Sequence, residues 1–296
     1  MGRVRSVARG VRAAAAVLRR PLWVPPGHYY SPIADRADID RAMAVADDRS
    51  DATALPGVDL REAAQRELAA RLSVHWPQVP TARTDGWRYH PDNPMFGLAD
   101  AAIYHSMLRE LRPGRVIEVG SGFSSAIALD TADRHLPELD LTFVEPYPDR
   151  LLGLLTDTDR RRSRLIRSAV QDVPLDTYDA LAGGDILFID STHVSKVGSD
   201  VNWLVFEVLP RLADGVIVHF HDIFWPFEYP RQWLEEGRGW TENYLLRAFL
   251  SYNDRFQVLL FNSWVWRAEI DLVRATLPNT VDQVPGGIWL RKVAPT

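Results

Sequence analysis

Short apolar runs alternate with segments of helical periodicity along most of the chain. The apolar runs predict strands at 115–119, 140–145, 164–168, 185–190, 215–220, 256–262 and 287–291. Between them, apolar positions at helical spacing predict helices at 98–111, 124–135, 148–156, 200–212 and 241–252. Alternating strands and helices with short connections indicate an α/β fold, in which helices cover both faces of a parallel sheet.

The first twenty residues form a basic segment. They contain six arginines and no acidic residue around a short apolar run at 13–18. Arg19, Arg20 and Pro21 follow this run in place of the small-residue cleavage site of a secretory signal. We therefore interpret residues 1–20 as a basic helical tail, with contact to a membrane surface as the alternative.

Residues 21–90 are predicted to form an amino-terminal extension and lid. Proline and aromatic residues near its start indicate an extended segment rather than a helix. Farther on, apolar residues from Leu60 to Leu72 recur at helical spacing and predict an amphipathic helix packed on the core. We place the main boundary near His90, so that residues 91–296 form the principal domain.

The composition of the chain disfavours several kinds of partner and site. The 296 residues are 46% hydrophobic, which suffices for one large α/β domain with additions. The net charge of −5 disfavours nucleic acid as a partner, because nucleic-acid-binding domains usually carry a basic excess. The absence of cysteine removes disulfides and thiolate zinc sites, and it suits a reducing cytoplasm, where we expect the protein to act. No apolar run approaches the roughly 20 residues of a membrane span.

The segment VIEVGSGFSS at 116–125 passes from a strand through a glycine turn into a helix. Gly120 and Gly122 allow a tight turn and the close approach of a ligand, although a purely structural turn also needs glycine. The helix that starts near Ser124 presents unpaired N–H groups that favour a carboxylate or phosphate. The next strand ends in Glu145, at the sheet edge where ligands bind in open α/β sheets. These features predict a nucleoside cofactor whose ribose meets Glu145.

Both dinucleotides and S-adenosylmethionine bind to folds with this pattern, and two residues distinguish between them here. The dinucleotide fingerprint has a third Gly or Ala for close helix packing, and Ser125 occupies that position here. Glu118 lies two residues before Gly120, where a dinucleotide-binding strand has no acid and where a carboxylate can orient the amino-acid end of a cofactor. The sequence favours S-adenosylmethionine, and a dinucleotide-dependent oxidoreductase stays the alternative.

Five segments carry a resemblance to the class I S-adenosylmethionine-dependent methyltransferases: VIEVGSGFSS, TFVEPYPDRL, SAVQDVPLDTYD, DILFIDSTH and VIVHFHDIF. Within that class the chain is similar to small-molecule O-methyltransferases, such as catechol-type enzymes and bacterial sugar O-methyltransferases. The resemblance implies a Rossmann-like three-layer sandwich with a mainly parallel seven-stranded sheet, whose last two strands form an antiparallel return. An amino-terminal helical and extended extension precedes this domain.

The resemblance also implies where the cofactor lies. The glycine turn holds its methionine part, the acid after the second strand holds its ribose, and a later segment flanks its adenine. The cofactor-binding residues are then Glu118, Gly120, Ser121, Gly122, Ser124, Glu145, Val170, Gln171, Asp172 and Asp190.

Polar residues gather where the fourth and fifth strands end. Asp190 and His193 come at the end of strand 185–190, and His221 and Asp222 follow strand 215–220. Because the carboxyl ends of neighbouring parallel strands face the same crevice, we expect these side chains to converge beside the glycine turn. Such a density of acids and histidines indicates a catalytic site.

This cluster could bind a metal ion. Asp190 and Asp222 can bind a hard divalent cation such as Mg²⁺ through oxygen. The metal-dependent O-methyltransferases that the chain resembles place carboxylates at these two strand ends. They commonly add an asparagine after the second acid, whereas Ile223 stands there in this chain.

The alternative to a metal ion is a histidine that acts as a general base, because neutral imidazole accepts a proton at physiological pH. We favour His193, beside Asp190, over His221, and His28 is a remote third candidate. His219 lies within the strand and is assigned to the opposite or packed face.

The predicted reaction is O-methylation of a small hydroxylated acceptor, because a hydroxyl needs the activation that a base or a metal supplies. The aromatic segment 224–230, with Trp233 and Trp240, is predicted to receive a sugar or phenol, or else to form a hydrophobic plug or a dimer contact. Arg231 and Lys196 are candidates for binding an acidic acceptor. A cofactor-binding protein without catalysis is a second alternative function, and self-association stays open.

Overall fold

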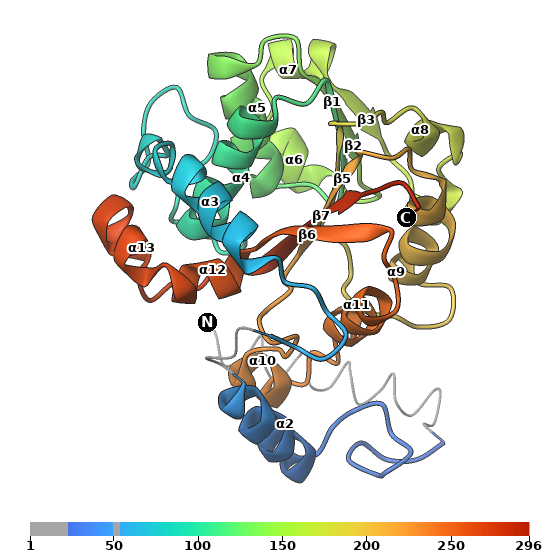
Figure 1. Cartoon of the computed structure of the whole chain (residues 1–296). Helices are drawn as coiled ribbons and strands as arrows, with labels where there is room; N and C mark the ends of the chain where they lie inside the picture. The colour runs from blue at the N-terminus through green and yellow to red at the C-terminus, as the bar shows by residue number, and fades with distance from the viewer. Residues whose placement is uncertain (1–22, 50–53, 296) are drawn as a thin grey trace, which may run out of the picture. The chain divides into compact units, whose positions relative to one another are not determined.

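A computed structural model describes residues 23–49 and 54–295, and the predicted basic tail at 1–20 lies outside them. Within this part of the chain, seven strands form one sheet in the order β3-β2-β1-β4-β5-β7-β6 (Figure 1). They are β1 Arg115–Val119, β2 Asp140–Val144, β3 Arg164–Ile166, β4 Ile186–Ile189, β5 Ile217–His221, β6 Phe256–Phe261 and β7 Gly287–Lys292. The first five strands pair in parallel, whereas β7 is antiparallel to both β5 and β6. The mainly parallel, Rossmann-like sheet with its antiparallel return is thus confirmed.

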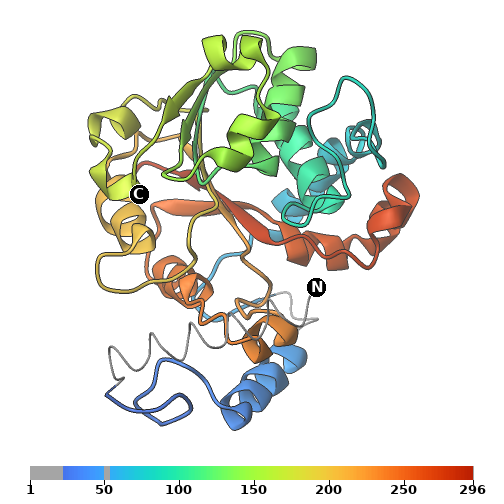
Figure 2. The ribbon, with the colours of Figure 1, turned by 180° about the vertical axis from the view of Figure 1, so that it is seen from behind.

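Helices cover both faces of this sheet. Helices α4 and α5 lie along one face, and α8 and α9 lie along the other (Figures 1 and 2). The described α-helices are α2 Arg36–Asp48, α3 Glu62–Ser73, α4 Leu98–Leu111, α5 Phe123–His135, α6 Asp149–Leu154, α7 Asp157–Arg162, α8 Asp176–Asp179, α9 Asp200–Trp203, α10 Arg231–Glu235, α11 Glu242–Ser251, α12 Asn262–Ala268 and α13 Ile270–Thr276. The arrangement is the expected three-layer sandwich.

Contacts within the chain define two compact units. Among the described residues, the larger unit comprises 46–49, 54–229 and 240–295 and contains the whole sheet, and the smaller unit comprises 23–45 and 230–239. Helix α3 packs on α4 and β6 within the larger unit, as the apolar spacing in this part of the sequence predicts. The contacts divide the chain after residue 45, and the boundary of the principal domain near His90 stays a prediction.

Two predicted elements differ from the structure in ways that affect the site. Strand β5 starts two residues later than predicted and continues through His221 instead of ending before it. The predicted helix 200–212 is instead α9, followed by a π-helical turn at 204–208 and a 3₁₀ turn at 209–211. Pro210 has no N–H for an α-helical ladder, which accounts for the end of regular helix there.

Several short helices gave no signal in the sequence. Helices α7, α8, α10, α12 and α13 span four to seven residues, which is too short to display an apolar period. Helix α2 is longer, but its buried residue is Ile39, so it has no apolar stripe to detect.

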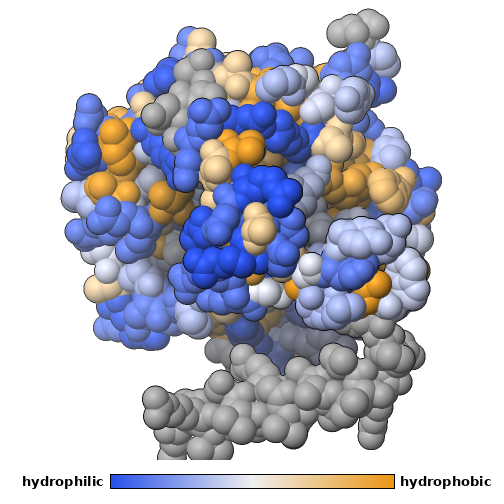
Figure 3. Space-filling view, turned by 90° about the horizontal axis from the view of Figure 1, so that it is seen from below, coloured by the Kyte–Doolittle hydropathy of each residue, from blue (hydrophilic) through white to orange (hydrophobic). Residues whose placement is uncertain are grey.

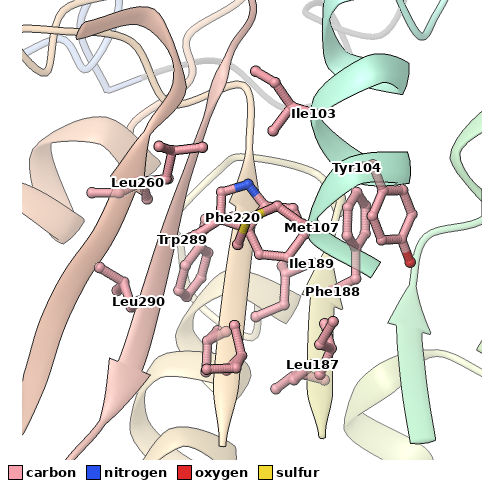
Figure 4. Packing of buried hydrophobic residues seen from close by; sticks show 14 of the residues in the cluster. Ile103, Tyr104, Met107, Leu187, Phe188, Ile189, Phe220, Leu260, Trp289 and Leu290 are labelled. Carbon is pink, nitrogen blue, oxygen red and sulfur yellow. The ribbon is translucent and has the colours of Figure 1, made fainter. Parts of the chain in front are cut away.

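A row of aromatic rings joins α4 to the centre of the sheet. Tyr104 of α4 stacks on Phe188 of β4 with ring centroids 4.3 Å apart. Phe188 stacks on His219 of β5 at 4.3 Å, and the His219 ring lies 4.2 Å from that of Trp289 on β7. Figure 4 shows Tyr104, Phe188 and Trp289 in this layer. All four side chains are buried, and their close packing fixes the positions of β4 and β5 against α4 and β7.

The guanidinium of Arg88 ties the segment before α4 to α5 and α7. Its Nε and Nη2 donate to the two carboxylate oxygens of Asp159 at 2.8 and 2.7 Å, and its Nη1 donates to Asp130 and Asp133 at 2.8 Å. The backbone N–H groups of Arg88 and Tyr89 also donate to Asp130. The side chains of Asp130 and Asp159 are fully buried, so Arg88 balances charge that water does not reach.

The described surface is mixed in character. On the face shown in Figure 3, hydrophilic and hydrophobic residues are interspersed. Among the described residues, no helix combines the length and the apolar character needed to cross a membrane.

Replacing Arg88 with leucine is expected to lower the free energy of unfolding by up to about 3–5 kcal/mol, because two buried carboxylates lose their closest cation. Arg162, at 3.0 Å from Asp159, and Arg134, at 3.7 Å from Asp130, stay beside them. Urea denaturation followed by circular dichroism measures this change. The matched control, Arg71→Leu, breaks a more exposed pair with Glu110 and is expected to cost less than about 1 kcal/mol. Equal losses in the two variants would contradict the role inferred for Arg88.

Candidate active site

Two adjoining cavities open at the carboxyl ends of β1, β2 and β4. The first has a volume of about 350 Å³, and the second has a volume of about 390 Å³. Gly120, Glu145, Asp190, Ser191 and Thr192 line both cavities and form their common wall. All residues that line them belong to the larger unit, so the crevice is a feature of the sheet and its loops.

The turn after β1 depends on a glycine at position 120. Gly120 has a φ of 80°, and its N–H donates to the carbonyl of Val144 at 3.0 Å. A Cβ atom at Gly120 would lie 1.8 Å from the carbonyl oxygen of Asp190. At Gly122 the backbone is extended, and a Cβ would meet the flexible side chain of Arg150 at 2.9 Å. The strict requirement for glycine therefore falls on Gly120.

Glu118 stabilises this turn from behind. Its side chain is fully buried, and its Oε1 accepts hydrogen bonds from the hydroxyls of Ser124 and Ser125, each at 2.7 Å. The Ser125 hydroxyl in turn accepts the N–H of Gly122 at 3.0 Å. Burial raises the pKa of Glu118 to about 8. Glu118 lines neither cavity, so the structure places it as a support for the turn rather than as the predicted direct contact to a cofactor.

Glu145 stands at the junction of the two cavities. Its Oε2 accepts the N–H of Ser121 at 3.1 Å, and its Oε1 accepts the N–H of Tyr147 at 2.8 Å. Two backbone groups thus fix a carboxylate beside both cavities.

The remaining predicted cofactor residues separate into two groups. Ser121, Gly122 and Ser124 line the first cavity. Val170 and Gln171 line the second, where the Gln171 amide donates to the carbonyl of Gly198 at 2.9 Å. Asp172, the last residue of the short 3₁₀ turn at 170–172, is exposed and lines neither cavity.

Asp190, His193, His221 and Asp222 meet in the first cavity. The Nε2 atom of His193 lies 3.4 Å from Oδ1 of Asp190 and 3.7 Å from Oδ2 of Asp222. The Nε2 atom of His221 lies 3.7 Å from Oδ1 of Asp222. The structure therefore brings together the four residues that the sequence placed at two neighbouring strand ends, and their catalytic roles stay a prediction.

Glu242 completes the surroundings of His193, and sequence reasoning missed it. The Nδ1 atom of His193 lies 2.9 Å from Oε2 of Glu242, and the two residues are 49 positions apart. The N–H groups of Thr241 and Glu242 donate to the His193 carbonyl at 2.9 and 3.2 Å. Burial alone would lower the pKa of His193, but Asp190 and Glu242 raise it well above its usual value. The only signal for Glu242 was its place in the first turn of a helix, where acids are common.

The two histidines of β5, His219 and His221, share one face of the strand. His221 packs against Phe96 with ring centroids 4.9 Å apart and lines the first cavity. Burial alone would lower the pKa of His221, but Asp222 and Asp190 raise it. His219 is packed in the core, as expected, and burial holds its pKa well below the usual value. It is not on the opposite face, because residues two apart in a strand point the same way.

The aromatic segment 224–230 does not line the crevice. Trp225, Phe227 and Tyr229 are buried, and the first two pack edge-on against Phe261. The plug interpretation therefore fits this segment better than the acceptor-binding one. Trp240 instead lines the first cavity, with its ring 4.4 Å from that of His193.

The other candidate acceptor residues also lie away from the first cavity. Lys196 lines the second cavity. Arg231 pairs with Asp40 at 2.7 Å within the smaller unit, which also contains His28 and Trp233.

Comparison with known proteins gives one family and one relative. Residues 117–223 match a family described as a methyltransferase domain. An uncharacterized protein of Archaeoglobus fulgidus is 32% identical over 166 residues, which cover 53% of this chain and 73% of that protein.

Three solved structures are similar at lower identity. The methyltransferase PaMTH1 of Podospora anserina, bound to S-adenosylhomocysteine, is 15% identical, covers 88% of this chain and 97% of its own, and has a TM-score of 0.42. The O-methyltransferase TomG of Streptomyces achromogenes, in complex with S-adenosylmethionine, is 14% identical with coverages of 87% and 99% and a TM-score of 0.44. CmcI with Mg and S-adenosylmethionine is 20% identical with coverages of 75% and 84% and a TM-score of 0.40. The strand order of the sheet assigns the fold.

Replacing Gly120 with alanine is expected to lower the free energy of unfolding by at least about 2 kcal/mol, through steric conflict and a left-handed backbone. Gly153→Ala is the matched control, because a Cβ there meets no atom within 4 Å inside helix α6. It is expected to be neutral or to stabilise by about 0.5–1 kcal/mol. Chemical denaturation measures both values, and an unchanged Gly120→Ala stability would contradict the packing described for the turn.

Proposed function

Because the chain belongs to the class I S-adenosylmethionine-dependent methyltransferases, we propose that it transfers a methyl group to a hydroxyl oxygen of a small acceptor. The acceptor is a sugar, a phenol or a natural product of similar size, and nucleic acid is not a partner. The cofactor, when bound, supplies an electrophilic methyl group on a positively charged sulfur. The C–O bond forms as the C–S bond breaks, and the hydroxyl proton leaves the acceptor. We assign this activity to the cytoplasm.

The position of Glu145 is the observation that carries the proposal. Its carboxylate is fixed by two backbone N–H groups at the common wall of the two cavities. A carboxylate so held accepts hydrogen bonds from the hydroxyls of a ribose. Ser121 and its neighbours in the glycine turn would then hold the methionine part in the first cavity, and Val170 and Gln171 would flank adenine in the second.

The first cavity supplies the groups that an acceptor hydroxyl needs. Asp190, His193, His221 and Asp222 line it, and Trp240 offers an aromatic face for a sugar or a planar ring. A hydroxyl is a weak nucleophile until it loses its proton, so its activation is the chemical task of this cavity. General-base assistance contributes about 10²–10⁴-fold in rate, and positioning of the acceptor adds to it.

Two routes to this activation use the same residues. In one route, the neutral form of His193 or His221 accepts the proton, with Asp190 and Glu242 orienting His193. Because neighbouring carboxylates raise the pKa of both histidines, this route gains rate as the pH rises and the imidazole loses its own proton. In the other route, a divalent cation such as Mg²⁺ held by Asp190 and Asp222 polarises the hydroxyl. Both routes lead to the same product, an O-methylated acceptor.

Two other functions make different predictions for the same crevice. A dinucleotide-dependent oxidoreductase would bind a nicotinamide cofactor there. A catalytically silent protein would bind S-adenosylmethionine but would release no S-adenosylhomocysteine in the presence of hydroxylated acceptors.

Isothermal titration of the full-length protein is expected to show micromolar binding of S-adenosylmethionine and no binding of a nicotinamide dinucleotide. Glu145→Gln is expected to weaken this binding by about 10–100-fold, because hydrogen bonds to a charged group are worth about 1.5–3 kcal/mol. Glu138→Gln, which changes an exposed acid before β2, is the matched control and is expected to bind as the wild type does.

Binding of the dinucleotide alone would contradict the proposed cofactor. Equal affinity of the Glu145 and Glu138 variants for S-adenosylmethionine would contradict the role of Glu145 while leaving the cofactor assignment in place.

A further inference from the structure

An aromatic segment at the start of the described chain faces solvent. Residues 23–34 contain no acidic residue and no lysine or arginine. None of these residues is buried, and Trp23 and Tyr29 are 83% and 81% exposed. Tyr30 is exposed as well. Exposed apolar surface gathered in one segment is typical of a site that binds a partner or a membrane.

The rings of this segment pack on one another and form an aromatic cluster of Trp23, His28, Tyr29 and Tyr30. Trp23 stacks on Tyr30 with ring centroids 5.2 Å apart, and His28 stacks on Tyr29 at 4.2 Å. In the described part of the chain, the hydrogen bonds of the cluster stay within residues 23–34, as from the N–H of Tyr30 to Nδ1 of His28 at 3.1 Å. The segment therefore folds on itself and presents its rings outward.

The sequence that precedes the cluster is basic and has an amphipathic spacing. Residues 1–22 lie outside the described part of the chain, and their sequence contains six arginines and no acid. Apolar residues recur in it at spacings of three and four, at Val4, Val7, Val11, Ala14, Leu18 and Leu22. Arginines recur at spacings of three, four and seven, at Arg5, Arg9, Arg12 and Arg19.

This spacing predicts two different faces on one helix. With about 3.6 residues per turn, the apolar set and the four arginines would fall on opposite sides of the helix. A basic amphipathic helix is typical of a segment that lies in the plane of a membrane surface, with its apolar face among the lipid chains.

Charge and aromatic character together favour an anionic lipid surface over another polyanion. Arginine is attracted to anionic headgroups, and tryptophan and tyrosine are enriched at the depth of the headgroups. A nucleic acid would engage the arginines but would leave the exposed, uncharged segment 23–34 without a role. The whole chain has a net charge of −5 although residues 1–22 contribute six positive charges. The rest of the chain is therefore acidic, and an anionic surface would attract mainly this end.

We propose that residues 1–30 bind the surface of an anionic phospholipid membrane, with the arginines on the headgroups and the aromatic cluster at the interface. The membrane contact that the basic tail left as an alternative is thereby extended to the described residues Trp23, Tyr29 and Tyr30. The proposal does not rest on the proposed function, because neither cavity of the candidate active site is lined by described residues of this segment.

The test mixes the full-length protein with vesicles and measures binding by cosedimentation. Vesicles of equal parts phosphatidylglycerol and phosphatidylcholine are expected to bind at least about 100-fold more tightly than vesicles of phosphatidylcholine, because each basic residue near an anionic surface adds up to fivefold. Hydrogen exchange is expected to slow in residues 1–30 and to stay unchanged in the sheet when the anionic vesicles are added.

An arginine variant tests the electrostatic part of the contact. It is expected to bind the anionic vesicles at least about 100-fold more weakly, and it combines Arg5→Gln, Arg9→Gln, Arg12→Gln and Arg19→Gln. The matched control removes the same charge from exposed positions of the larger unit and is expected to bind as the wild type does, with Arg161→Gln, Arg164→Gln, Arg167→Gln and Arg267→Gln.

An aromatic variant tests the interfacial part. Trp23→Ala combined with Tyr29→Ala is expected to weaken binding to the anionic vesicles by about tenfold, because two rings no longer leave water. Tyr252→Ala is the control, because Tyr252 is 94% exposed in the larger unit, and it is expected to bind as the wild type does.

Equal binding to the two kinds of vesicle, or wild-type binding by the arginine variant, would overturn the proposal. Wild-type binding by the aromatic variant would overturn the part assigned to the aromatic cluster. Binding of the wild type to single-stranded RNA as tightly as to the anionic vesicles would overturn the assignment of lipid as the partner.

Discussion

The close approach of two backbone segments at the edge of the sheet is the constraint on which the site depends. Gly120, after β1, lies so near the carbonyl of Asp190, after β4, that no side chain fits between them. Both β2 and β4 pair with β1, so Glu145 and Asp190 emerge on either side of this contact. The contact therefore gives the two cavities one rigid common wall.

Two polar residues at the same edge have a strained backbone. His193 and Asp222 have φ values of 60° and 55°, which residues other than glycine rarely adopt. Such residues cost roughly 1–3 kcal/mol each and persist where surrounding contacts hold them, as the N–H groups of α11 hold the His193 carbonyl. Strained backbone at two polar residues of one cavity is typical of a site shaped for chemistry.

The sequence predicted the parts of the site that follow from strand order. Glu145, Asp190 and Asp222 stand directly after strands, so the alternation of elements was enough to bring them to one edge. Glu242 was not predictable, because it reaches His193 from a helix far along the chain and an acid in the first turn of a helix usually faces water. The burial of Trp225 was not predictable either, since an aromatic segment has the same composition whether it packs inward or receives a ligand.

A crystal structure of the protein with S-adenosylhomocysteine tests the central claim most directly. The account predicts ribose hydroxyls on the carboxylate of Glu145, adenine in the second cavity beside Val170, and the sulfur facing Asp190 in the first cavity. Adenine in the first cavity, or a ligand bound outside both cavities, would contradict it.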